Sequence, residues 1–473
     1  MCMDTDFPFS ITQISTSDVG GGAERIALDL HRTYQARGAD ARLAVGFMRG
    51  DPSLAGVVSL DPRAGAGSAW ARWLRRLAPD VQQAQSGVAA RVRRRALYAL
   101  ASPTQALRRA RGVPEFEAGA AEVLALLDRG PASVQRILHL HNLHGGYFDL
   151  QALPELCAAV PVFVTLHDAW LTTGHCAHGR DCERWRTGCG DCPHLEYPPP
   201  LSTDRSAELW QAKRAVLARS ALRVIAPSKY MARRVEDSIL SPALRSLTVI
   251  PNGVDARVFK PALPGEKARL RASFGLPADA FVICYSAVGA QANPYKDTGT
   301  VLSVAERVAE RLATGNERAS VVLVVIGGQE QRAANGGGRL LTMGTGYLQS
   351  SVEVANWMRA SDILVHSAHV EAFGLTSVEA QLCGLPVVVT ATGGLPETMA
   401  DGKSGFVAPE GDAEMIAALL VCLAREGELR SKMGEAAARF AAARFTLETM
   451  ADRYLEYYAC QSVPSCASQR LTR

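Results

Sequence analysis

The chain has 473 residues, which is more than one typical domain needs and enough for two. Hydrophobic residues make up 48% of it, a content that allows sizeable cores and excludes a collagen-like or globally disordered chain. The net charge of +4 at pH 7 is too mild to indicate a nucleic-acid partner, so we expect none.

The N-terminal residues show no basic segment followed by a long apolar run, and no stretch of about 18 apolar residues occurs. We therefore expect neither a secretory leader nor a membrane-spanning helix. In such a chain the eleven cysteines are better interpreted as reduced thiols than as a disulfide framework. Together these features predict a cytoplasmic protein.

The first predicted strand, at 11–15, runs into a glycine-rich turn that opens a helix. Gly21 and Gly22 let the backbone approach a ligand closely, and free amides at the helix start attract anionic or hydroxyl oxygens. The signal is weak by itself, because many α/β folds have such a turn with no ligand. Gly38 ends the helix, whose apolar face carries Ala23, Ile26, Ala27, Leu30 and Tyr34.

An arginine-rich segment follows at 63–111, with eleven arginines and a single acidic residue, Asp80. Trp70 and Trp73 interleave with its arginines. This pattern fits a basic amphipathic helix that contacts anionic lipid. It also fits a solvated helical insertion, about 63–128, that packs on its own domain.

Apolar runs of strand length recur along the chain, each ended by a polar or turn-forming residue. Runs without alternation are typical of strands buried on both faces of a parallel sheet. Helical patterns lie between them, so the sequence predicts a doubly wound α/β architecture. The runs lie at 136–142, 160–168, 223–228, 247–253, 281–289, 321–328, 362–368 and 386–394.

Histidines gather where two of these runs end. His139 and His141 alternate and should point to one face of their strand, which could suit a metal pair. Structural hydrogen bonding or contact with an acceptor is the better explanation, because ligands bind at the carboxyl ends of such strands. We therefore take His141 and Asn142, together with Asp168 at the end of the next strand, as acceptor-side candidates. His167 and Asp168 end the next strand, and a buried strand that ends in His-Asp indicates function.

The segment 174–193 contains four cysteines, Cys176, Cys182, Cys189 and Cys192. The last two have a C-x2-C spacing that is usual for zinc ligands. The segment is poor in apolar residues, so a structural zinc would help it fold. Free thiols, disulfides and an iron–sulfur cluster are the alternatives, because the first two spacings are longer than in most zinc knuckles.

The α/β pattern pauses at 251–267, where three prolines and two glycines indicate a linker. We place the domain boundary near residue 262, which gives an N-terminal domain at 1–262 and a C-terminal domain at 263–441. A C-terminal helix at 442–460 is expected to cross back to the N-terminal domain. A polar tail at 461–473 follows it.

The stretch 369–390 carries two glutamates, Glu371 and Glu379, with Gly374 between them where a helix should begin. A carboxylate can accept from two neighbouring hydroxyls, which suits a sugar or ribose diol. The free amides of a helix start suit a diphosphate. The pattern therefore predicts a site for a sugar, a diphosphate and a ribose, although two exposed glutamates at a helix start are also common.

These motifs together resemble the retaining glycosyltransferases of family four, whose GT-B fold has two Rossmann-like domains facing a cleft. The segments around 141–148 and 165–193 are similar to a subgroup that builds bacterial exopolysaccharides, such as the colanic-acid type. The resemblance covers nearly the whole chain except the arginine-rich segment and the tail. Its matching motifs are GGAER (21–25), SKYMARRV (228–235), IPNGVD (250–255), the stretch 371–387 and GGLPE (393–397).

The resemblance implies a transferase that moves a sugar from a nucleoside-diphosphate sugar to a saccharide or lipid-linked acceptor, with retention and without a required metal. It implies that Glu371 holds the donor sugar, Glu379 holds the ribose, and Lys296 neutralises the leaving diphosphate. His167 is expected near the reacting sugar. The remaining donor-binding residues that it implies are Gly21, Gly22, Phe373, Gly374, Leu375 and Thr376.

One departure from the family pattern concerns the phosphate-binding cations. Relatives usually carry a second cation several residues before the lysine that matches Lys296, and here that stretch has none. Lys229 or Arg233 could serve instead. The departure favours one alternative, a non-catalytic subunit that binds nucleotide sugars. A nucleotide-sugar epimerase of GT-B fold is the other alternative.

Overall fold

The computed structural model describes residues 9–60, 119–130, 134–287, 293–313, 320–335 and 339–462, with four isolated positions between 93 and 100. The chain divides into two compact units. Unit 1 takes the described residues of 1–227, 231–250 and 451–473, and unit 2 takes those of 228–230 and 251–450.

The change of unit at 250–251 comes earlier than the boundary expected near 262. The physical reason is that the predicted linker is not free of packing. Val254 and Phe259 are buried in the main hydrophobic core of unit 2, so this segment already belongs to it. Proline and glycine content indicated a turn here but gave no information about the two buried side chains.

Unit 1 is built on a seven-stranded sheet in which every pairing is parallel, in the order β3-β2-β1-β4-β5-β6-β7. This confirms the parallel sheet expected from the apolar runs. Its strands are β1 (Phe9–Ser17), β2 (Asp40–Phe47), β3 (Val57–Ser59), β4 (Gln135–Leu140), β5 (Val162–Thr165), β6 (Leu222–Ala226) and β7 (Leu244–Val249).

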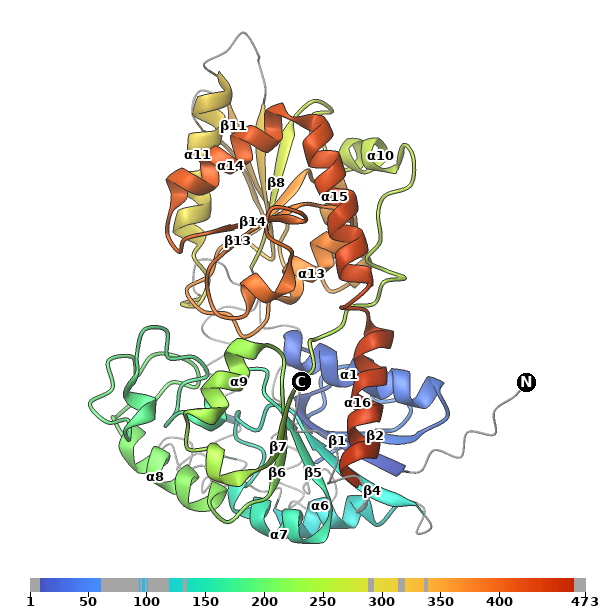
Figure 1. Ribbon diagram of the computed structural model, residues 1–473, viewed down its shortest axis with the longest axis vertical. Coiled ribbons are helices and arrows are strands. Elements are labelled where there is room, and N and C mark those ends of the chain that lie inside the picture. The colour runs from blue at the N-terminus through green and yellow to red at the C-terminus, as the bar shows by residue number, and fades with distance from the viewer. Residues whose placement is uncertain are drawn as a thin grey trace. The chain divides into compact units, whose positions relative to one another are not determined.

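Helix α1 (Gly22–Ala36) follows β1, as the apolar pattern predicts, and the five side chains expected on its inner face are buried. Gly38 follows its end with φ +83, a left-handed conformation that favours glycine. The other described helices of unit 1 are α6 (Ala120–Leu127), α7 (Leu153–Ala159), α8 (Ser206–Leu217), α9 (Lys229–Glu236), whose first two residues fall in unit 2, and the greater part of α16 (Leu447–Ser462) (Figure 1).

Unit 2 also has a seven-stranded sheet, in the order β10-β11-β9-β8-β12-β13-β14. Its pairings are parallel except that of β10 with β11, which is antiparallel and was not expected. The connection between these two strands is too short for a parallel crossover. The strands are β8 (Phe281–Ser286), β9 (Val321–Ile326), β10 (Gln331–Asn335), β11 (Leu340–Gly344), β12 (Ile363–His366), β13 (Val387–Thr390) and β14 (Gly405–Ala408).

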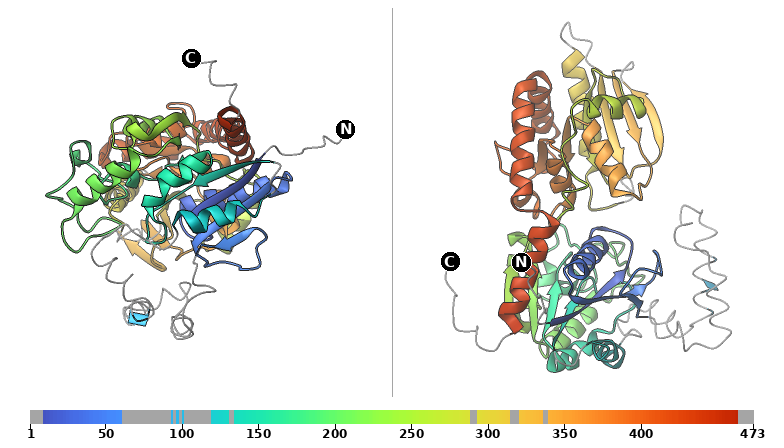
Figure 2. Two further views of the ribbon diagram at one scale, coloured as in Figure 1. Left: turned by 90° about the horizontal axis from the view of Figure 1, so that it is seen from below. Right: turned by 90° about the vertical axis from the view of Figure 1, so that its right-hand side faces the viewer.

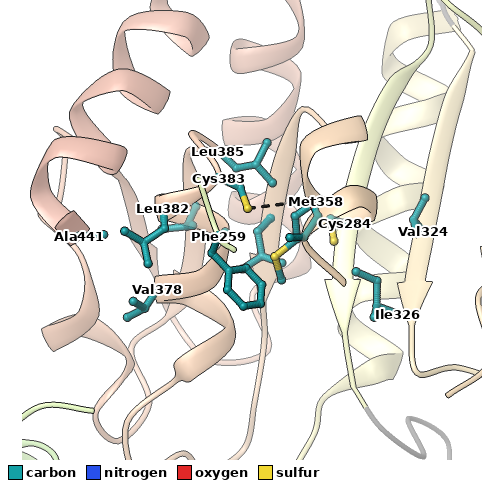
Figure 3. Packing of buried hydrophobic residues seen from close by; sticks show 14 of the residues in the cluster. Phe259, Cys284, Val324, Ile326, Met358, Val378, Leu382, Cys383, Leu385 and Ala441 are labelled. Atoms are coloured by element: carbon teal, nitrogen blue, oxygen red, sulfur yellow. Dashed lines mark hydrogen bonds between the residues drawn. The ribbon is translucent and has the colours of Figure 1, made fainter. Parts of the chain in front are cut away.

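Helices cover both faces of the sheet in unit 2, since alternate residues of β8 enter two different cores. Val282 and Cys284 pack with α12 and α13, and Ile283 and Tyr285 pack with α11 and α14. Figure 3 shows the first of these cores around Phe259. The helices are α10 (Glu266–Ser273), α11 (Thr298–Ala313), α12 (Ser351–Ala360), α13 (Leu375–Leu382), α14 (Ala413–Arg425) and α15 (Gly427–Ala442).

The C-terminal part of the chain forms two helices, α15 and α16, which are separated at 443–446 (Figure 2). From residue 451 onward α16 belongs to unit 1. Tyr454 and Tyr458 are fully buried there. The Tyr458 hydroxyl lies 2.7 Å from Nδ1 of His139, and the Tyr454 hydroxyl lies 2.9 Å from that of Thr165. These contacts explain why the helix returns to unit 1.

No helix in the described part of the chain is long and apolar enough to cross a membrane. The expectation of lipid contact at 63–111 falls almost wholly outside the described residues. Of the predicted insertion at 63–128, the structure shows α6, whose Val123, Leu126 and Leu127 are buried.

Candidate functional site

The site in unit 2 is built around the start of α13. Gly374 precedes the helix with φ +110, and a Cβ at this position would lie 2.5 Å from Cδ2 of Leu395. Only glycine fits both requirements. The helix therefore begins where the sequence predicted, and the amides at its first turn, from Leu375 and Thr376, lie at its positive end.

Lys296 and Glu371 form an ion pair beside this helix start. Nζ of Lys296 lies 2.7 Å from Oε2 of Glu371 and 3.3 Å from Nε2 of His366. The side chains of Lys296 and Glu371 are 16% and 22% exposed, so the pair is screened from most solvent while remaining reachable. The structure thus brings together two residues that the sequence predicted separately.

The charges in this group follow from its burial and its partners. Burial by itself would raise the pKa of Glu371, but Lys296 and His366 outweigh it and hold that pKa well below its usual value. Burial and the charge of Lys296 lower the pKa of His366. At neutral pH the group therefore contains a carboxylate and a neutral imidazole.

His366 is a site residue that the sequence analysis missed. It is the last residue of β12 and is 2% exposed. Its Nδ1 is buried without a hydrogen-bond partner in the described structure. The only available signal was its position at the end of an apolar run, the same signal that singled out His167.

Two predicted donor-binding residues are deeply buried. The Phe373 ring is 3% exposed and packs edge-on against Phe445, so its side chain belongs to the core and only its backbone could line a diphosphate. Glu379 is 5% exposed and lies in the second turn of α13. Its charge acts on His366, so it lies near the same group.

The predicted residues in unit 1 gather at one edge of its sheet. Strands β1, β4 and β5 are neighbours, and the predicted residues follow their carboxyl ends. This edge is where ligands bind in doubly wound folds. Gly21 and Gly22 are exposed at the start of α1. A pocket at this edge is lined by residues that include His141, Asn142, His144, His167, Asp168 and Trp170.

His167 is held by His141. Nε2 of His167 lies 2.9 Å from Nδ1 of His141, whose Nε2 lies 3.0 Å from Oε1 of Gln13. Burial lowers the pKa of His167 to about 4 and that of His141 well below its usual value. Both imidazoles are therefore neutral at pH 7. Gln13 was not anticipated, because one glutamine in an apolar strand gives no pattern.

Asp168 pairs with His144 at 2.7 Å and accepts the amide hydrogen of Trp170 at 2.8 Å. Burial would raise the pKa of Asp168, but His144 outweighs it and lowers that pKa to about 2. Burial would lower the pKa of His144, but Asp168 raises it. The pocket thus contains a third histidine, His144, whose role the sequence did not indicate.

His139, on β4, and Asn142, just after it, have contacts within the protein. His139 uses both ring nitrogens, one with the Thr165 hydroxyl at 2.8 Å and one with the Tyr458 hydroxyl at 2.7 Å. These bonds favour the structural explanation of His139 over a metal pair. The carbonyl of Asn142 accepts from the Tyr147 hydroxyl at 2.5 Å.

The zinc site predicted from the four cysteines stays a prediction. Within the described residues no group of three or more His, Cys, Asp or Glu side chains is placed to hold a metal ion. Sγ of Cys189 accepts from the Gly174 amide at 3.3 Å, and Sγ of Cys192 lies 3.3 Å from Nε2 of His175. Cys176 and Cys182 are also free thiols.

Burial and one lysine also stabilise this loop, for which we expected a structural zinc to help folding. Trp185 is 3% exposed and has the Arg234 guanidinium 4.1 Å from its ring centre. Nζ of Lys213 donates to the carbonyls of Trp170 at 2.7 Å and of Thr173 at 3.0 Å. A few aromatic rings thus bury surface that a count of aliphatic residues overlooks.

Comparison with known proteins identifies the family. Residues 20–258, just over half of the chain, match the family described as "Glycosyltransferase Family 4", and residues 266–440 match "Glycosyl transferases group 1". The chain belongs to glycosyltransferase family 4. The resemblance found in its motifs is therefore confirmed over both units.

This family 4 chain is similar to several curated proteins. It is 32% identical to the "D-inositol 3-phosphate glycosyltransferase" of Thermomonospora curvata, over 44% of this chain and 50% of that protein. It is 25% identical to the "Putative colanic acid biosynthesis glycosyl transferase WcaC" of Escherichia coli, over 68% of this chain and 76% of that protein. The chain spans about half the length of the inositol phosphate glycosyltransferases it matches.

Solved structures share its fold. Anabaena Alr3699/HepE, solved in complex with UDP and glucose, is 17% identical and has a TM-score of 0.56, covering 95% of this chain and 99% of that one. WaaG, a glycosyltransferase involved in lipopolysaccharide biosynthesis, is 16% identical with a TM-score of 0.57, covering 94% and 99%. These likenesses and the two parallel sheets confirm the GT-B fold class.

Proposed function

We propose that the protein transfers a sugar from a nucleoside-diphosphate sugar to a saccharide or lipid-linked saccharide, with retention, in bacterial polysaccharide synthesis. The single observation that carries this is the grouping of Lys296, Glu371 and His366 beside the start of α13. It supplies a cation, helix amides and a carboxylate in one place. Family membership supports the same reaction, and the relatives named above are glycosyltransferases, not epimerases.

In this proposal the donor lies along the start of α13. The amides of Gly374, Leu375 and Thr376 and the ammonium of Lys296 meet the diphosphate, because the helix end and the cation both favour negative charge. Glu371 holds hydroxyls of the sugar and Glu379 those of the ribose. A fold relative that was solved with UDP and glucose supports a nucleotide-sugar donor.

The reaction breaks the bond between the anomeric carbon and the diphosphate oxygen, and the electron pair leaves with the diphosphate. Lys296 stabilises the negative charge that develops there. The acceptor hydroxyl attacks from the face the diphosphate leaves, and its proton passes to a diphosphate oxygen. We propose that catalysis needs no divalent metal, because Lys296 and the helix start supply positive charge. His167, a neutral imidazole, would contact the reacting sugar.

A lipid-linked acceptor would place the enzyme at the cytoplasmic face of the membrane, and we propose the arginine-rich segment 63–111 as its contact there. Its composition supports this, since basic residues interleaved with tryptophan favour anionic lipid. Binding of the full chain to liposomes should then need acidic lipid and weaken with salt. Equal binding to neutral liposomes, or no binding, would leave a solvated insertion.

A turnover panel tests the function. The purified full chain is incubated with UDP-, GDP- and dTDP-sugars and saccharide acceptors, and both the released nucleoside diphosphate and the glycosylated product are measured. Transfer that requires Lys296 and Glu371 supports the proposal. Conversion of the nucleotide sugar to an epimer, or binding without any release in every combination, would replace it with one of the two alternatives.

A further inference from the structure

Three polar side chains of unit 1, of which Gln13 and His141 are buried, form a continuous hydrogen-bonded chain that ends at His167. Gln13, on β1, contacts His141 at 3.0 Å, and His141 contacts His167 at 2.9 Å. Gln13 and His141 are 0% and 1% exposed. The two imidazole rings lie nearly parallel, with an interplanar angle of 15°. The hydrogen bond to His141 therefore fixes the orientation of the His167 ring.

The chemistry of each partner sets the direction of these hydrogen bonds. With its amide oxygen toward His141, Gln13 accepts, so the proton of His141 lies on Nε2. A neutral imidazole carries one ring proton, which leaves Nδ1 of His141 as an acceptor. The donor in the second bond is then Nε2 of His167, and Nδ1 of His167 keeps its lone pair.

We propose that Gln13 and His141 are positioning residues that fix the tautomer of His167, so that its Nδ1 presents an acceptor to a ligand hydroxyl. The identity of that hydroxyl as one on a sugar rests on the proposed glycosyltransferase function. The tautomer itself does not rest on it, because Gln13 and His141 impose it in the protein alone.

Asp168, the neighbour of His167 in sequence, is not available to accept a hydrogen bond from the same ligand hydroxyl. Its two carboxylate oxygens are used by His144 and by the Trp170 amide. Nδ1 of His167 makes no hydrogen bond to the described residues and is not among their buried unpaired atoms, and His167 lines the pocket at this sheet edge. The lone pair on Nδ1 of His167 is thus available to a ligand in this pocket.

The consequence for specificity is a preference for a hydroxyl donor. A ligand that lacks that hydroxyl, or carries a keto group in its place, would leave Nδ1 of His167 without a partner. The loss of one neutral hydrogen bond weakens binding by about three- to ten-fold.

The tautomer can be measured directly in the full chain with ¹⁵N-labelled histidine. Two-bond ¹H–¹⁵N correlation spectra distinguish a protonated ring nitrogen from a bare one, and His167→Gln and His141→Gln spectra assign the signals. At pH 7.5 we expect His167 to show a protonated Nε2 and a bare Nδ1. A protonated Nδ1 on His167, or an averaged mixture, would overturn the proposal.

Gln13→Met keeps the length of the side chain and removes the acceptor, so His167 should shift to a mixture of tautomers. Thr12→Val is the matched control, because Thr12 is a buried neighbour on β1 whose hydroxyl has no partner in the described structure. It should leave the signals of His167 unchanged. A Gln13→Met protein that keeps the wild-type tautomer would also refute the role of Gln13. The spectra are recorded without a nucleotide sugar, so a wrong tautomer would refute this proposal without bearing on whether the protein transfers a sugar.

Discussion

Lys296→Met removes the charge of the predicted phosphate-binding lysine and keeps most of its bulk. The ammonium of Lys296 is 2.7 Å from Glu371 and lies beside the N-terminus of α13. If it stabilises the leaving diphosphate, kcat should fall by roughly 10²–10³, the range for one preorganised electrostatic donor. The assay is the release of nucleoside diphosphate with the donor and acceptor that the panel identifies.

The same substitution should also affect stability, so the two effects must be separated. Glu371 would lose its cation while remaining 22% exposed, which we expect to cost about 1–3 kcal/mol in the free energy of unfolding. Lys267→Met is the matched control, because Lys267 makes an ion pair of the same 2.7 Å length with Asp362 in unit 2. It should lose less stability in urea unfolding, because Arg271 still pairs with Asp362 at 2.6 Å, and it should keep its kcat.

A fall in kcat of less than about three-fold for Lys296→Met would show that another cation performs this role. Equal losses of kcat in Lys296→Met and Lys267→Met would show that the rate follows stability and not charge. In either case the assignment of Lys296 to the leaving group would be wrong.

Three further predictions concern single residues. Glu379→Ala should weaken calorimetric binding of free nucleoside diphosphate by about ten-fold or more, and unchanged affinity would exclude the ribose contact. Gly374→Ala should cost about 1–3 kcal/mol in urea unfolding, because of its φ of +110 and the clash with Leu395, and a neutral effect would contradict the geometry. Asp168→Asn should lose about 2 kcal/mol at pH 6, since the lowered pKa of Asp168 gives stability that is present above about pH 4 and is lost toward pH 2; the same difference at pH 2 would argue against ion pairing with His144.

Local patterns in the sequence determined the class of fold and much of the site. Apolar runs without alternation predicted two parallel sheets, because strands buried on both faces have no polar side. Gly374 between Glu371 and Glu379 predicted the start of α13, because a helix start after a left-handed residue is a local feature. Lys296 was found through a family motif, whereas His167 was also singled out by its position at the end of an apolar run.

Tertiary structure decided which of these residues meet. His366 joins Lys296 and Glu371 because β12 and the loop after β8 lie side by side, and no sequence period encodes that pairing. Gln13 reaches His141 because β1 and β4 are neighbours although more than a hundred residues separate them.

The cysteine loop at 174–193 and helix α16 also depend on contacts that the sequence could not predict. Spacing suggested a zinc site for the cysteines, which stays a prediction, but it gave no sign that Trp210 and Lys213 of α8 donate to the carbonyls of Trp185 and Trp170. Tyr454 and Tyr458 join α16 to unit 1 through His139 and Thr165. Short-range patterns record what each segment can form, but the partners of a buried polar group are fixed only when the strands and helices around it pack.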